Sequence, residues 1–436
     1  MFYLDGTYKE IIRMNKLLVI GINYYPELTG IGKYTAEFSN FLANEGNCEV
    51  DVITGNPYYP RWKIFDGYKN KWFTKEKINN VSVYRVPLYV PSSPTSIKRQ
   101  VQDILFFFST ILLATYFLVF HKKRYNYVFI AVPSFTLGLA GLYYRFFARK
   151  AIILYHIQDL QIDAAEQLGM IKKKTLLKLY YSVERFILEN VNYVSTISEG
   201  MQKKILAKSN NIKECHIFSN WINNTCIYPI NPKPFVKYDA LKGKKIIFYS
   251  GSIGEKQGLE VLIATASCFS NRKDVAFVIA CEGPQKEKLV ELAEKLNLDN
   301  VYFFNLLPTG QFNELLNASY IHLVIQKEEA GDLVLPSKLT NILGVGGCAI
   351  ITAWPGTSLF QIVEEAKCGY VVPPFDVTAL SAAINLLLTD EELYLEISRN
   401  ALAYAGKFLE INVIIKEYLT WIGLTEVAST QEIANV

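Results

Sequence analysis

The feature that most constrains the fold is an alternation of short apolar β-type runs with helical runs, which starts twice along the chain. In the first half, such runs lie at 16–22, 48–56, 81–90, 125–133, 151–159 and 191–200. After the first run, apolar side chains recur at the period of a helix, at Ile31, Tyr34, Phe38 and Phe41. This β-α-β rhythm predicts an α/β fold with a doubly wound parallel sheet.

The same rhythm restarts after a segment rich in Asn, Pro and Lys, residues 219–243, which is typical of a linker. The later β-type runs lie at 244–252, 275–283, 301–307, 320–326 and 348–354, followed by helical patterns at 377–404 and near 408–422. A chain of 436 residues exceeds what one core usually serves. We therefore expect two Rossmann-like domains, the first at 14–218 and the second at 244–404, joined by a linker at 219–243. A C-terminal helix at 405–424 could pack back on the first domain. An extension at 1–13 and a tail at 425–436 complete the chain.

The composition excludes several classes of protein. Half of the residues are hydrophobic and 20% are charged, which argues against disorder. The seven cysteines are scattered and form no C-x-x-C pair, and there are four histidines, so neither a disulfide framework nor a metal site is expected. The first 13 residues carry charges and no long apolar run, which argues against a secretory signal. We expect a cytoplasmic protein.

The charge is unevenly distributed between the two halves. Residues 1–218 hold 28 lysines and arginines against 17 acidic residues, a net charge of +11, while the rest of the chain carries −7. A basic half predicts an anionic partner, such as a phospholipid surface, a lipid pyrophosphate or a nucleic acid. The alternative is a solvated, lysine-rich surface without a partner.

Residues 104–120 form an uncharged apolar run followed by a basic H-K-K-R segment. A membrane-spanning helix needs about 20 apolar residues, so the run is borderline in length. It also lies inside a regular α/β succession, where a span would split one sheet across a bilayer. A buried helix, a helix in the membrane interface and a true span remain open as alternatives.

Two glycine turns occupy corresponding places in the two halves, each between a β-type run and a helical run. The first holds Gly30 and Gly32; the second holds Gly251, Ser252, Gly254, Lys256 and Gln257. Glycine lets the backbone approach a ligand, and a helix N-terminus favours phosphate, so both turns are candidate phosphate sites. The alternative for each is a tight turn that binds nothing. Neither turn matches G-x-G-x-x-G, which disfavours a nicotinamide dehydrogenase.

A further candidate site begins at Leu335-Pro336-Ser337, which has the character of a helix start. Lys338 would then lie in the first helical turn, where a cation opposes the helix dipole. A diphosphate ligand would explain a lysine at that place, and Asn341, one turn later, could bind a ribose. The alternatives are an exposed lysine and a polar surface residue.

The remaining candidates lie at the ends of β-type runs, where α/β sheets bind ligands. His156 and Asp159 follow one run and could serve a transferred group or take a proton. Glu282 and Leu307 follow two runs of the second half and could border a nucleoside. A histidine bonded to backbone is the alternative for His156.

Together these motifs resemble a known family. The segments GINYYPELTGIGKYTAEF, YSGSIGEKQGLE, VIACEGP and LVLPSKLTNILGVGG are similar to those of GT-B fold, family 4 retaining glycosyltransferases. YHIQDLQIDAAEQLGM and FSNWI narrow the resemblance to the WcaI type of colanic-acid and other exopolysaccharide clusters. It covers roughly residues 14–424.

The resemblance implies a nucleotide-diphosphate sugar as donor, held mainly by the second domain, transfer with retention, and no required metal. It also implies that the leaving phosphate helps to deprotonate the acceptor. Gly30 and Gly32 would approach the donor phosphate, and His156 would lie beside the transferred sugar. Lys256 or Gln257 would meet the diphosphate, with Glu282 and Leu307 at the base.

The chain departs from the family pattern at three places. Ser252 stands where many members have arginine, and Gln257 where lysine is usual. Asn341 replaces the second glutamate of the familiar E-x7-E pair, and Glu329 and Asp332 are loose candidates for the first. These changes leave Lys338 a larger share of the phosphate charge.

We therefore expect a hexosyl or deoxyhexosyl transferase acting on a lipid-linked saccharide acceptor in exopolysaccharide biosynthesis. Its basic first half would face the cytoplasmic membrane, as a peripheral protein, and nucleic acid is not an expected partner. A GT-B nucleotide-sugar epimerase and a non-catalytic membrane-associated binding protein are the alternatives.

Overall fold

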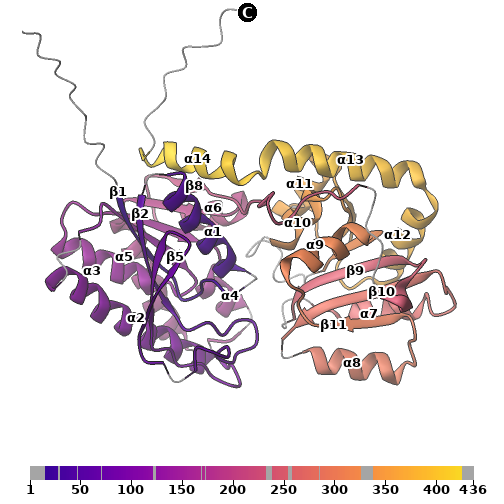
Figure 1. The fold of residues 1–436 in the computed structure, drawn as a ribbon, viewed down its shortest axis with the longest axis horizontal. Coiled ribbons are helices and arrows are strands. Elements are labelled where there is room, and N and C mark those ends of the chain that lie inside the picture. The colour runs from indigo at the N-terminus through magenta and orange to yellow at the C-terminus, as the bar shows by residue number, and fades with distance from the viewer. Residues whose placement is uncertain are drawn as a thin grey trace, which may run out of the picture.

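The computed structural model describes residues 15–27, 30–46, 48–69, 71–120, 124–167, 169–171, 173–231, 238–253, 258–283, 285–325 and 337–424. The expected extension 1–13 and tail 425–436 lie outside these residues. Figure 1 shows two α/β domains side by side, with two long helices running along one side of both.

The described residues of the first domain contain an eight-stranded sheet in the order β3-β4-β2-β1-β5-β6-β7-β8. Every neighbouring pair is parallel except β3 with β4, which is antiparallel. The strands are β1 Asn15–Ile20, β2 Cys48–Gly55, β3 Thr74–Ile78, β4 Val81–Val86, β5 Tyr127–Val132, β6 Ile152–Ile157, β7 Tyr193–Thr196 and β8 Cys215–Ile217.

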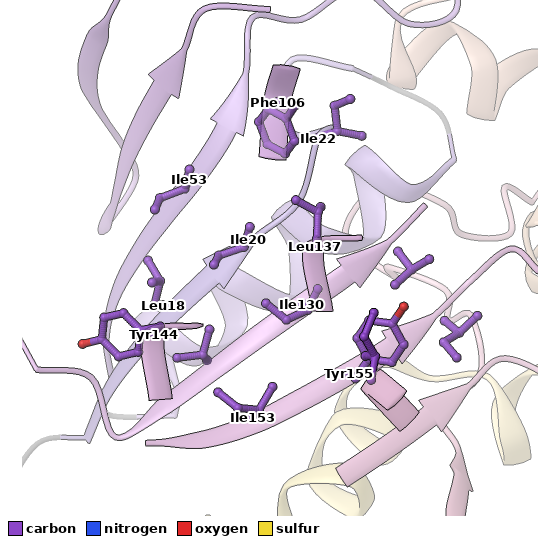
Figure 2. Packing of buried hydrophobic residues seen from close by; sticks show 14 of the residues in the cluster. Leu18, Ile20, Ile22, Ile53, Phe106, Ile130, Leu137, Tyr144, Ile153 and Tyr155 are labelled. Carbon is purple, nitrogen blue, oxygen red and sulfur yellow. The ribbon is translucent and has the colours of Figure 1, made fainter. Parts of the chain in front are cut away.

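Helices cover both faces of this sheet: α1 Ile31–Asn44, α2 Ser96–Val119, α3 Leu137–Phe147, α4 Gln161–Gln167, α5 Lys174–Asn190 and α6 Glu199–Leu206. Successive side chains of a strand point to opposite faces, so each strand feeds two cores. Leu18, Ile20 and Ile130 point to one face, where Phe106 of α2 and Tyr144 of α3 pack on them (Figure 2).

The second domain has six strands over its described residues, all parallel, in the order β11-β10-β9-β12-β13-β14. They are β9 Lys245–Ser252, β10 Val275–Glu282, β11 Val301–Phe304, β12 Ile321–Val324, β13 Cys348–Thr352 and β14 Tyr370–Val372. The described helices are α7 Glu260–Ser267, α8 Lys286–Lys295, α9 Thr309–Ala318, α10 Ser337–Gly344, α11 Ser358–Ala366, α12 Val377–Thr389 and α13 Glu391–Phe408, after a short 3-10 turn at Asp239–Leu241. The predicted α/β class with two parallel sheets is confirmed, with β3 as an antiparallel addition at the edge of the first sheet.

The last helix, α14 Ile411–Trp421, returns to the first domain. Its Tyr418 ring stacks on Phe218 with 4.0 Å between ring centroids, and it closes the core formed by α1 and β5. The amide of Ile222 donates to the carbonyl of Leu409 at 2.7 Å, so the chain segments that cross between the domains are bonded to each other.

The strand orders place both glycine turns at topological switch points. In the first sheet the chain runs outward from β1 to β2 and β4 on one side and to β5 and its successors on the other. In the second sheet it runs in the same way from β9, with β10 on one side and β12 on the other. Loops after such central strands are where open α/β sheets bind ligands.

Helix α2 contains the borderline apolar run. Its segment Ile97–Val119 is long and apolar enough to cross a membrane by length and composition, and a third of its most apolar window is buried. Phe106 and Phe117 of this helix are fully buried in the core of the first domain. One face of α2 is therefore part of the domain, and a spanning position would expose that core.

Candidate functional site

The first glycine turn has backbone that only glycine adopts easily. Gly30, the residue before α1, has a φ of 63°, and a Cβ there would meet no atom closer than Tyr59 Cε1 at 4.0 Å. Gly32 is different, because its Cβ would lie 3.1 Å from Glu27 Oε2 and 3.2 Å from the Tyr24 amide nitrogen. Gly30 leaves open space beside the backbone, whereas a side chain at position 32 would crowd Glu27 and Tyr24.

Glu27 holds this turn to the loop after β2. Its Oε1 accepts the amides of Tyr58 and Tyr59 at 2.8 and 2.9 Å, and its Oε2 accepts Asn23 Nδ2 at 2.8 Å. Burial raises the pKa of Glu27 to about 7, against the lowering effect of these hydrogen bonds. The two loops at the end of the first sheet are therefore fixed to each other by one carboxyl group.

Lys338 lies in the first turn of α10, partly buried against the end of β9. Its Nζ stands 3.9 Å from the centroid of the Tyr249 ring. Gly251 has a φ of 140°, which favours glycine, and a Cβ there would lie 3.4 Å from that Nζ, so the ammonium lies in contact range of the backbone at the end of β9. Burial, without any contribution from a described carboxylate, lowers the pKa of Lys338 to about 7. A partly dehydrated cation at the end of a strand is suited to an anionic ligand.

Helix α1 of the first domain contacts helix α10 of the second. Lys33 Nζ donates to Asn341 Oδ1 at 3.4 Å, and the hydroxyls of Tyr34 and Thr340 lie 3.4 Å apart. The helix that starts at the Gly30 turn thus touches the helix that carries Lys338. That the predicted phosphate residues of the two halves share one ligand stays a prediction.

A second bridge between the domains joins Arg61 to Glu282. The guanidinium Nε and Nη2 donate to the two carboxylate oxygens at 2.9 and 3.0 Å. Glu282 ends β10 and its side chain is 12% exposed, whereas Arg61 is 62% exposed. The carboxylate that was predicted to border a base is therefore bound to an arginine of the first domain here.

His156 lies within β6 and is buried. Its ring packs against Phe129 and Phe218, and its Nδ1 lies 3.0 Å from Ser195 Oγ. Burial lowers the pKa of His156 to about 3, so the ring is neutral near pH 7. This is the position of a core histidine, and its predicted place beside a transferred sugar stays a prediction. Asp159 follows the same strand in the loop before α4 and is partly buried.

The other predicted residues are placed only in part. Leu307 follows β11 and packs partly buried against the core under α9. Ser252 ends β9 and Ser337 begins α10, while the positions of their side chains are not described. Gly254, Lys256, Gln257, Glu329 and Asp332 lie outside the described residues. Within the described ranges, no group of three or more His, Cys, Asp or Glu side chains could hold a metal ion.

Known proteins share both the sequence and the fold. The chain is 37% identical to the colanic acid biosynthesis glycosyl transferase WcaI of Escherichia coli (strain K12) over 425 residues, which covers 93% of this chain and 98% of WcaI. Residues 232–404 match the family Glycosyl transferases group 1. The chain belongs to this glycosyltransferase family.

Solved structures of lower identity share its two-domain fold. Sucrose-phosphate synthase from Thermosynechococcus elongatus superposes with a TM-score of 0.71 at 17% identity, covering 94% of this chain and all of the synthase. Anabaena HepE, solved in complex with UDP and glucose, gives 0.69 at 13% identity over 94% of this chain and 99% of HepE. The GT-B architecture expected from the motifs is therefore confirmed.

Three residues that make contacts at the candidate site were not predicted. Lys33 directly follows Gly32 in the first turn of α1, so the rule that singled out Lys338 would also have found it. Arg61 lies in the loop after β2. The rule that made Glu282 a candidate, namely that residues after strand ends can contact a ligand, would also have selected it. Glu27 had no signal of its own, because its role depends on amides 31 and 32 residues away.

Replacing Arg61 with alanine is expected to change the melting temperature by less than about 3 °C. The pair is largely exposed on the arginine side, and such pairs contribute about 0–1 kcal/mol. The variant should instead change how the two domains are held together, because they lose a bidentate ion pair. The X-ray scattering profile of the variant without donor should therefore show a larger radius of gyration than that of wild type. A melting temperature lowered by 10 °C or so would instead make Arg61 a stability residue.

Proposed function

We propose that this glycosyltransferase moves a hexosyl or deoxyhexosyl group from a nucleotide-diphosphate sugar to a lipid-linked saccharide, with retention, during exopolysaccharide assembly. The name of the WcaI relative supports the assignment to exopolysaccharide synthesis. The UDP and glucose held by HepE support a nucleotide sugar as donor.

The observation that carries the proposal is the position of Lys338. Its ammonium lies next to Gly251, and the helix that carries it, α10, contacts α1. In the proposed reaction, the bond between the anomeric carbon and the diphosphate oxygen breaks, and the acceptor oxygen bonds to that carbon. Negative charge grows on the leaving diphosphate, and a fixed cation at this place would stabilise it.

The same residues bear on which group takes the proton of the acceptor and on whether transfer requires a metal. His156 is buried and its pKa is lowered to about 3, which makes it a weak base, so the leaving phosphate or Asp159 is a better candidate to take the acceptor proton. Lys338 and Lys33 can supply positive charge to a diphosphate, so we propose that transfer requires no metal. The acceptor would be reached at the inner face of the cytoplasmic membrane, which the basic first half favours.

A thermal-shift screen of UDP-, GDP- and dTDP-sugars tests the donor class. A donor at 100 times its Kd adds about 2.7 kcal/mol of stability, and we expect a rise of about 5–10 °C for the correct nucleotide. The matching donor should then be consumed rapidly only with an acceptor present. No shift with any nucleotide sugar would contradict the proposal, and an altered donor sugar formed without acceptor would make the protein an epimerase.

A further inference from the structure

Helix α2 has one face in the core and one face in solvent that is apolar along the whole helix. Phe106, Thr110, Leu113 and Phe117 are buried on the first face. The opposite face follows the helical period and exposes Ile97, Val101, Ile104, Leu105, Phe108, Leu112, Tyr116, Val119 and, just after the helix, Phe120. Soluble surfaces seldom carry a continuous apolar strip of this length, about 30 Å, so the strip points to a partner.

Two neighbouring helices contact α2, and one of them, α3, extends its apolar face. The hydroxyls of Thr115 on α2 and Tyr143 on α3 lie 2.7 Å apart, and α3 ends in Phe146 and Phe147, which are 75% and 54% exposed. Tyr180 of α5 donates to Gln100 Oε1 at 2.9 Å. Figure 1 shows α2, α3 and α5 grouped in the first domain.

Cations border the apolar strip. Lys98 and Arg99 are exposed in the first turn of α2. Arg149 and Lys150, which are also exposed, follow Phe146 and Phe147. Asp103 is the one charged residue from Val101 to Phe120, and it is partly buried. An apolar strip with a cationic border is the pattern of a helix that lies in the interface of an anionic membrane.

We propose that the α2 surface, formed by the exposed side chains of α2 with Phe146 and Phe147, lies in the headgroup and acyl boundary of a leaflet that contains anionic phospholipids. A second copy of the chain would bring two cationic borders together, which disfavours a dimer through this face. A span is disfavoured because the other face of α2 is core.

The purpose that we assign to the α2 surface, access to a lipid-linked acceptor, rests on the proposed function. The guanidinium of Arg99 lies 4.8 Å from the centroid of the Trp62 ring, and the preceding residue, Arg61, reaches Glu282 of the second domain. The strip therefore begins next to the contact between the domains. A saccharide could reach that contact while its lipid chain stays in the bilayer.

Vesicle flotation with the full chain tests the α2 surface. The probes are vesicles of phosphatidylglycerol with phosphatidylethanolamine, and vesicles of phosphatidylcholine alone. We expect wild type to float with the anionic vesicles, and the variant Phe108→Ser/Leu112→Ser to bind them at least about tenfold more weakly. The matched control, Leu395→Ser/Phe408→Ser, removes two exposed apolar side chains from α13 and should bind like wild type.

Several results would overturn the proposal: no flotation of wild type, equal flotation of the Phe108→Ser/Leu112→Ser variant, or wild type that resists extraction by alkaline carbonate as a spanning protein does. A wild-type dimer that this variant dissociates, without vesicle binding, would assign the surface to a second copy. Transfer to a water-soluble acceptor should be retained by the variant. Vesicle binding together with no sugar transfer would support the surface and contradict the proposed function.

Discussion

Replacing Lys338 with methionine is expected to lower the rate of sugar transfer about 100- to 1,000-fold, the usual effect of losing one preorganised group that stabilises developing negative charge. The reason is the position of its ammonium, which lies between the Tyr249 ring and Gly251 at the end of the central strand β9. Methionine has a similar length and no charge. The measurement is kcat/KM for the donor with a fixed concentration of acceptor.

The melting temperature separates this loss from unfolding. Lys338 is partly buried without a described carboxylate partner, so removal of its charge should leave stability unchanged or higher. The control is Lys273→Met, in the same domain, where the lysine pairs with Asp299 at the surface. Full activity of the Lys338→Met variant would remove this lysine from the mechanism.

The pH dependence of donor binding follows from the same lysine. Burial lowers the pKa of Lys338 to about 7 in the free protein, and a bound diphosphate would raise it again. Above about pH 7, binding must therefore be accompanied by uptake of a proton. Donor affinity should fall by up to about tenfold per pH unit between pH 7 and 9 in wild type, and should be flat in Lys338→Met. Calorimetry in buffers of different ionisation enthalpy would detect the proton.

The fold was predictable because its signal is periodic. Apolar β-type runs separated by helical runs report a parallel sheet directly, and the restart at 244 matches the start of β9 at Lys245. The short or polar edge strands were missed: β3 has three charged residues in succession, and β8 and β14 have three residues each. Such strands depend on a neighbour that already exists, so local sequence says little about them.

The arrangement of the candidate site was predictable only where a residue's neighbours are close in sequence. Gly30 and Lys338 follow from turn and helix-start rules that act within a few residues. His156 illustrates what local rules lack, since adjacent residues of a strand face opposite ways and Tyr155 and His156 belong to different cores. The core in which His156 lies is closed by α14, a helix some 260 positions later in the chain. Arg61 and Glu282, 221 residues apart, were likewise beyond any local pattern.

Replacing Glu27 with alanine is expected to lower the free energy of unfolding by about 2–4 kcal/mol, and the melting temperature by about 5–15 °C. The carboxyl group is buried and accepts three hydrogen bonds, two of them from the amides of Tyr58 and Tyr59. Alanine would leave those donors without their partner and would open a space beside Gly32. Donor affinity should fall as well, because the turn at Gly30 loses its attachment to the loop after β2.

Glu27→Gln distinguishes the shape of this group from its charge. Glutamine can accept hydrogen bonds from the amides of Tyr58 and Tyr59 through its Oε1. The side chain of Asn23 must then turn, so that its carbonyl oxygen accepts a hydrogen bond from the amide group of the glutamine. The pKa of Glu27 is raised by burial to about 7, so the protonated form is the one that the fold favours. Its stabilising contribution is complete below the unfolded pKa of about 4.5 and is lost as the pH rises through about 7.

Two outcomes follow for unfolding measured between pH 5 and 8. The difference in stability between wild type and Glu27→Ala should narrow as the pH rises, because wild type loses the contribution of the protonated group. Glu27→Gln should keep most of the stability and should lack that pH dependence, since an amide cannot ionise. If Glu27→Ala melted within about 2 °C of wild type at pH 5, the two loops would be held together by contacts other than this carboxyl group.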